Sequence, residues 1–140
     1  MLKYPNSTVD FSASPADALA PFQVYDREEW EDYLCQFDPN DFEQMVPLFN
    51  KYFFEVKNRI YTAAHKAIVV KALADALQCE SYNFEALLEP DDDGCLYFPS
   101  GWKIQDYRLF FKEIYRITLE HWADELTQAG YTVVPLSSIP

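Results

Sequence analysis

Basic side chains gather in the middle of this chain, where Arg59, His65, Lys66 and Lys71 lie within the stretch RIYTAAHKAIVVK. An imidazole can exchange a proton near neutral pH, and a guanidinium can hold a phosphate through two hydrogen bonds. The Arg59–His65 pair is therefore a candidate for chemistry on a phosphodiester.

The spacing of this pair resembles the arginine–histidine motif of HEPN-family ribonucleases, which are also small helical proteins. The resemblance implies that His65 and Arg59 would act on the 2′-hydroxyl and the phosphate of RNA. It covers these two residues alone, and Ile60 stands where that family usually has a polar residue. A small helical ribonuclease is thus one interpretation. The other is an arginine and a histidine exposed on the back of a helix.

Acidic residues outnumber basic ones, with 23 Asp and Glu against 11 Lys and Arg, which gives a formal net charge of -12. The acids concentrate in residues 26–43 and 80–93, on either side of the basic residues 51–71. Such a charge repels nucleic acids and anionic membranes and favours a cationic partner. The carboxylates expected to contact that partner are Glu28, Glu29, Glu31, Asp32, Asp38, Asp41, Glu85, Glu89, Asp91, Asp92 and Asp93.

These acids lead to the favoured functional interpretation, a non-catalytic protein-binding module that engages a basic surface of another protein. In its sharpest form the protein is a DNA-mimicking inhibitor, of the antirestriction or anti-defence type, that occupies a nucleic-acid-binding site. The basic strip could instead neutralise the acids internally, through surface ion pairs worth about 0–1 kcal/mol each. The two arrangements can coexist, because the acids outnumber the bases.

One acidic turn also resembles a metal-binding loop. Glu89, Asp91 and Asp93, followed by Gly94, resemble the first half of an EF-hand calcium loop. The twelfth position of such a loop, normally a bidentate glutamate, is Ser100. Calcium binding at Asp91–Asp93 stays open, and we expect no resident metal or cofactor.

Cysteine usage and hydropathy bear on the compartment. Cys35, Cys79 and Cys95 are odd in number and lack C-x-x-C spacing, which favours buried thiols in a reducing compartment. No apolar run approaches the roughly 20 residues needed to span a bilayer. We therefore expect a cytoplasmic protein that does not insert into membranes.

Apolar spacing predicts a mainly α fold, with an irregular N-terminal arm over residues 1–24 and a single helical domain over 25–140. The expected elements are two long helices at about 47–78 and 103–129, shorter helices near 26–37, 39–45 and 83–89, and at most a two-stranded β element pairing 95–98 with 131–135. In the first helix, one apolar face is expected to hold Trp30, Tyr33, Leu34 and Phe37.

A heptad-like apolar stripe runs from Phe42 to Leu77 and is interrupted at Pro47. The stripe could be the spine of the domain's own core. It could also be the seam of a homodimer, and a dimeric chaperone or assembly factor is the third functional interpretation.

Overall fold

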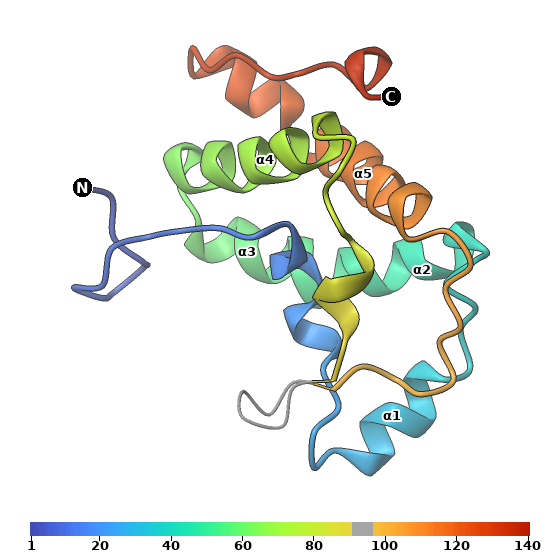
Figure 1. Cartoon of the computed structure of the whole chain (residues 1–140). Coiled ribbons are helices and arrows are strands. Elements are labelled where there is room, and N and C mark those ends of the chain that lie inside the picture. Colours follow the sequence, from blue (N-terminus) through green and yellow to red (C-terminus); the bar gives the residue numbers. More distant parts are fainter. Residues whose placement is uncertain (91–96) are drawn as a thin grey trace.

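Two long helices, α4 (Ala63–Gln78) and α5 (Tyr107–Gln128), pack against each other in the computed structural model (Figure 1). The structure describes residues 1–90 and 97–140. Leu73 and Leu77 of α4, and Phe111 and Trp122 of α5, are each at most 1% exposed. The apolar residues that predicted these helices therefore lie in the interior, and the mainly helical fold class is confirmed.

A second helical segment lies below α4 and α5 in the view of Figure 1. It runs from α2 (Phe42–Phe49) through a π-helical turn, η2 (Asn50–Phe54), into α3 (Glu55–Ile60). Pro47 lies inside α2 without ending it, although a proline removes one helical hydrogen bond. The expected separation of a helix near 39–45 from one starting at residue 47 is therefore wrong.

The long helix predicted for residues 47–78 is instead divided at Tyr61 and Thr62, where the backbone is extended. The Thr62 hydroxyl accepts a hydrogen bond from the His65 backbone N–H at 3.4 Å, and His65 Nδ1 accepts one from the Thr62 N–H at 3.1 Å. This reciprocal cap satisfies backbone groups that a new helix would leave unpaired. A coiled-coil seam needs one uninterrupted helix, so this break removes the predicted seam.

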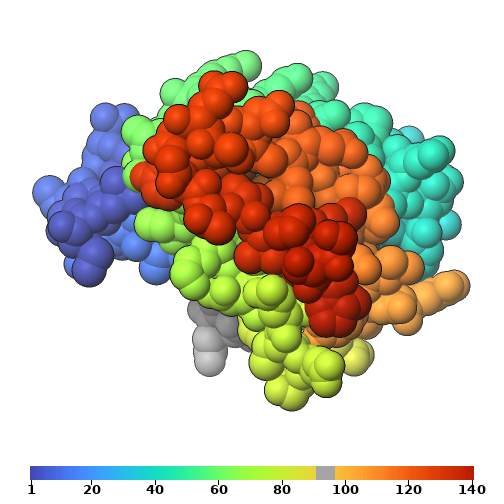
Figure 2. All heavy atoms as spheres, turned by 90° about the horizontal axis from the view of Figure 1, so that it is seen from above, coloured from blue at the N-terminus to red at the C-terminus, as the bar shows by residue number. Residues whose placement is uncertain are grey.

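The N-terminal residues contain a 3-10 helix, η1 (Pro15–Phe22), which was not expected. Ser14 caps this helix, and its buried face includes Leu19 and Phe22, which are both fully buried. The first residues form a projection at one side of the molecule (Figure 2). Residues 15–22 are therefore part of the core, together with Phe11, which is 7% exposed.

Helix α5 begins later than the predicted residue 103, because the Asp106 side chain accepts a hydrogen bond from the Leu109 N–H at 3.0 Å and caps the helix there. It ends as predicted, since Gly130 has a φ of +91° that suits the residue just beyond a helix. The helix expected near residues 83–89 is a short 3-10 helix, η3 (Glu85–Leu88).

The predicted pairing of residues 95–98 with 131–135 is not seen. Residues 95 and 96 lie outside the described part of the chain, and neither 97–98 nor 131–135 forms a strand. The carbonyl of Tyr97 instead accepts a hydrogen bond from the Val24 N–H at 2.6 Å. A final 3-10 turn, η4 (Leu136–Ser138), follows residues 131–135.

Candidate functional site

The acidic helix α1 (Glu28–Leu34) lies at the edge of the molecule, apart from α4 and α5 (Figure 1). Its Trp30 is held in place by a hydrogen bond from the indole N–H to the Pro21 carbonyl at 3.0 Å. Leu34 is fully buried and fixes the other end of the helix. Trp30 and Leu34 therefore attach helix α1 to the core, while Glu28, Glu29 and Asp32 stay exposed.

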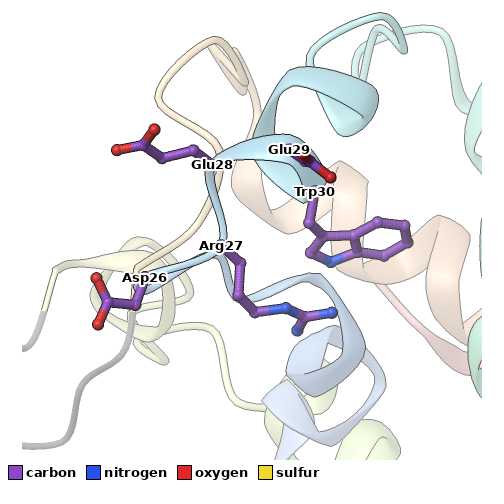
Figure 3. Close-up of a pocket in the computed structure, with 5 residues that line it drawn as sticks. All are labelled: Asp26, Arg27, Glu28, Glu29 and Trp30. Carbon is purple, nitrogen blue, oxygen red and sulfur yellow. The ribbon is translucent and has the colours of Figure 1, made fainter.

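The start of α1 forms a shallow hollow of about 690 Å³ lined by Asp26, Arg27, Glu28, Glu29 and Trp30. Asp26 and Glu28 extend to one side of the chain, and Arg27 and Trp30 extend to the other (Figure 3). Arg27 donates a hydrogen bond to the Gln23 carbonyl at 3.2 Å, and its guanidinium lies 5.3 Å from the centre of the Trp30 ring. The basic side chain of this hollow, Arg27, thus turns toward Trp30, and within residues 1–90 and 97–140 no ion pair neutralises the acids of the hollow.

Glu31 differs from the other acids of α1. It is half-buried, and its carboxylate accepts a hydrogen bond from the Ser100 N–H at 3.0 Å. The indole of Trp102 adds a second link, because it donates to the Leu34 carbonyl at 2.9 Å. Glu31 therefore positions residues 97–102 against α1, in addition to adding charge.

The acids that follow α1 lie in a turn. The helix expected to start near residue 39 begins later, as α2, after Asp41. The Asp38 carboxylate accepts from the Asn40 N–H at 2.9 Å, and the Asp41 carboxylate accepts from the Gln44 side chain at 3.0 Å. Both aspartates stay exposed, so the turn extends the acidic surface beyond the helix.

The second acidic segment is anchored by Arg108, which donates hydrogen bonds to the carbonyls of Cys79 and Glu80 and lies 4.9 Å from the centre of the Phe84 ring. Glu85 and Glu89 are exposed in and just after η3. The predicted site residues Asp91, Asp92 and Asp93, and with them the EF-hand-like turn, lie outside the described residues.

One hollow connects the two acidic segments. Asp26 and Glu31 line a space of about 390 Å³ together with Pro90 and Tyr97. Pro90, in the second acidic segment, therefore lies beside Asp26 and Glu31 of the first, although more than fifty residues separate them in the sequence.

The described basic residues do not neutralise these acids. Lys66 pairs with Glu125 at 2.8 Å and Lys71 pairs with Asp75 at 2.6 Å, and neither acid belongs to the two acidic segments. Within residues 1–90 and 97–140, no ion pair involves the predicted site residues, which here are Glu28, Glu29, Glu31, Asp32, Asp38, Asp41, Glu85 and Glu89. Internal compensation by the basic strip is therefore not seen for this part of the surface.

The Arg59–His65 pair has a different geometry from the one that RNA cleavage needs. His65 is only 5% exposed, and its Nε2–H donates to the Lys3 carbonyl at 2.6 Å. The Nδ1 atom accepts from the Thr62 N–H, so both ring nitrogens are occupied. Arg59 is exposed on α3, on the other side of the break before α4. In this arrangement His65 has no free nitrogen with which to accept a proton from a substrate.

The cysteines are not where the sequence suggested. Cys35 and Cys79 are exposed, whereas buried thiols were expected, and Cys95 lies outside the described residues. A hydrogen bond with the Ser81 hydroxyl, at 3.4 Å, lowers the pKa of the Cys79 thiol. In the described ranges, no three His, Cys, Asp or Glu side chains lie close enough together to hold a metal ion.

The apolar face expected to hold Trp30, Tyr33, Leu34 and Phe37 is only partly buried. Among these four residues Leu34 is fully buried, whereas Tyr33 is 38% exposed. The Tyr33 ring contacts the rings of Trp30 and of Phe37, which lies beyond the end of α1, and Trp30 also contacts Tyr52 of η2. We call Trp30, Tyr33, Phe37 and Tyr52 the aromatic row. The sequence indicated the spacing of most of these aromatic residues but not how exposed they are.

Comparisons of this chain with protein-family models, with curated proteins and with solved structures found no match. No helix among the residues that the structure describes combines the length and the apolar character required to cross a bilayer.

Proposed function

We propose that this protein is a non-catalytic binding module that engages a basic surface of another protein through the acids of α1 and the turn after it. The observation that carries the proposal is that Glu28, Glu29 and Asp32 are exposed on a helix that the core holds in place, and that none of them forms an ion pair with another described residue. Residues three and four apart on a helix lie on one side of it, about 5–6 Å apart at Cβ, so these three carboxylates concentrate negative charge.

In its sharpest form, the proposal is an inhibitor that occupies the nucleic-acid-binding site of its partner. DNA presents one negative charge per roughly 1.7 Å of its axis. Carboxylates on α1, on the turn with Asp38 and Asp41, and on the neighbouring segment with Glu85 and Glu89 would present such a field over several positions. A cationic site that normally holds phosphates would be attracted to the same field.

Charge reversal tests this proposal. A tagged protein carrying Glu28→Lys and Asp32→Lys should lose its partner in a pull-down from nuclease-treated host lysate, whereas the unaltered protein retains it at low salt and releases it at high salt. The matched control carries Glu55→Lys and Asp124→Lys, two exposed acids on α3 and α5 that change the net charge equally.

The outcome depends on the difference between the two variants. Retention by the control and loss by the α1 variant would support the proposal. Equal retention by both variants would contradict it, and equal loss would show that the net charge matters rather than the surface of α1. Recovery of RNA in place of a protein before nuclease treatment would also contradict it.

A further inference from the structure

The aromatic row is unusual because it lies within an acidic surface and stays partly exposed. The Trp30 and Tyr33 rings are stacked, with centres 5.6 Å apart and planes at 15°, and Tyr33 meets Phe37 at 5.3 Å. Tyr52 contacts the other side of Trp30 at 4.8 Å. Exposed aromatic side chains that are already fixed by their neighbours are typical of contact surfaces, because little conformational entropy is lost on binding.

Cations of the chain itself already occupy two rings of this row. The Arg27 guanidinium lies 5.3 Å from the centre of the Trp30 ring, and the Lys51 ammonium lies 5.3 Å from the centre of the Tyr52 ring. These distances fall within the range in which a cation is attracted by the face of an aromatic ring. Among the described residues, no basic side chain lies over the more exposed ring of Tyr33 in this way.

Helix spacing places one carboxylate beside that ring. Glu29 is four residues before Tyr33 on α1, so the two side chains are neighbours on the same side of the helix. Glu29 is exposed and forms no ion pair within the described ranges. A group bound against Tyr33 would therefore meet an aromatic face and a carboxylate together.

Arginine fits this pair of features better than lysine does. Its planar guanidinium can stack on a ring and at the same time donate hydrogen bonds in its plane to a carboxylate. A lysine ammonium is a strongly hydrated point charge, which lacks a flat face for stacking. Further acids lie beyond both ends of the row, with Asp26 before Trp30 and Asp38 after Phe37, so more than one positive charge can be accommodated.

We infer that the aromatic row and its flanking acids bind an arginine-rich segment of a partner protein, with one guanidinium stacked on Tyr33 and hydrogen-bonded to Glu29. This inference rests on the proposed function and specifies its partner. The negative charge around the row repels nucleic acid and anionic lipid, which disfavours both as occupants of the same surface.

The test compares two peptides of equal length, nona-arginine and nona-lysine, in titrations with the whole protein at low salt. The arginine peptide should bind roughly two- to fivefold more tightly, which corresponds to one exposed cation–π contact. Tyr33→Leu should remove this preference, because leucine keeps apolar bulk but has no ring. Tyr33→Phe should retain it. Thermal unfolding of each variant would verify that α1 is still folded.

Two more variants complete the design. Glu29→Gln should weaken binding of both peptides, and Tyr131→Ala, at a tyrosine 40% exposed in the segment after α5, should change neither. Equal binding of the two peptides, unchanged binding by Tyr33→Leu, or no binding of either peptide would overturn the inference. The proposed function is judged separately, by the pull-down with the Glu28 and Asp32 reversals, so either can fail while the other stands.

Discussion

The contact between α4 and α5 and the surface of α1 both place charged groups beside aromatic rings, but only the first neutralises its charge internally. Lys66 is 5% exposed, is paired with Glu125 and lies 5.6 Å from the centre of the Trp122 ring. Glu28, Glu29 and Asp32 are exposed and have no such partner among the described residues. Charge in the first region serves the fold, whereas charge in the second is available to another molecule.

The largest effect expected from this comparison is at Glu125. Glu125→Ala would leave the Lys66 ammonium buried without a counter-charge and should lower the free energy of unfolding by about 2–3 kcal/mol. This cost is smaller than for an ion pair in which both side chains are buried. The Glu125 side chain is 45% exposed, so the Lys66 ammonium could reach water through the space that the removed carboxylate leaves.

Urea unfolding would measure this effect, with Asp124→Ala at the neighbouring exposed position as the control. Adding Lys66→Met to Glu125→Ala should recover most of the loss, because it removes the buried charge and keeps an apolar stem. A Glu125→Ala protein as stable as its control would show that the pair is not structural and would break the comparison.

An intermediate effect is expected at Tyr115 of α5, whose buried hydroxyl also has its partner within the chain. Its hydroxyl donates to the Val134 carbonyl at 2.6 Å, and burial raises the pKa of the phenol from 10.0 to about 12. The folded protein therefore retains a proton that the unfolded chain releases. The associated stability is complete below pH 10 and is lost as the pH rises from 10 through 12, by about 1.4 kcal/mol per pH unit for one proton.

Tyr115→Phe should cost about 1 kcal/mol at neutral pH through the lost hydrogen bond. Above pH 10 the free energy of unfolding of this variant should fall less steeply with pH than that of the unaltered protein. The difference in slope should correspond to about one proton. Burial also raises the pKa of Tyr61 to about 12, so Tyr61 would still make the stability of the Tyr115→Phe variant decrease with pH in this range. Denaturation curves between pH 8 and 12 would measure both slopes, and identical slopes would contradict the assignment to Tyr115.

The smallest effect is expected on α1 itself, and it has the opposite sign. Like charges four residues apart on a helix repel by about 0.2–0.5 kcal/mol. The double variant Glu28→Gln with Asp32→Asn should therefore leave the stability unchanged or raise it by a few tenths of a kcal/mol, while weakening partner binding. Calorimetric melting of the variant would sharpen the contrast with Glu125. A loss above 1 kcal/mol would instead make these acids structural.

Most of the helical fold could be predicted from the local spacing of apolar residues. The apolar spacing in residues 103–129 and Gly130 located α5 and its end, because both are properties of the segment itself. The break at Thr62 was missed because its cap uses His65, where a capping box normally has Glu or Gln. The helix through Pro47 was also missed, since neighbouring contacts can outweigh one lost hydrogen bond.

The candidate site was predictable in part. Charge counting identified the acidic segments, because charge is a property of residue type. Charge counting could not distinguish Glu31 from Glu29. Glu31 accepts a hydrogen bond from the Ser100 N–H, whereas Glu29 is exposed and has no ion-pair partner in the described ranges. The exposure of Tyr33 depends on how α1 meets the core, so its place on an apolar face did not indicate how far it is buried. Pairing and exposure are tertiary properties, which periodicity does not encode.

The positions of the partners of His65 and Lys66 bear on the order of events during synthesis. His65 binds the carbonyl of Lys3, made 62 residues earlier, and Lys66 binds Glu125, made 59 residues later. As the chain leaves the ribosome, His65 can bind the Lys3 carbonyl as soon as both have emerged. Lys66 can pair with Glu125 only after most of α5 has been synthesised. Until then, burial of α4 on the Lys66 side would trap a lone charge, so this side of the core is expected to close last.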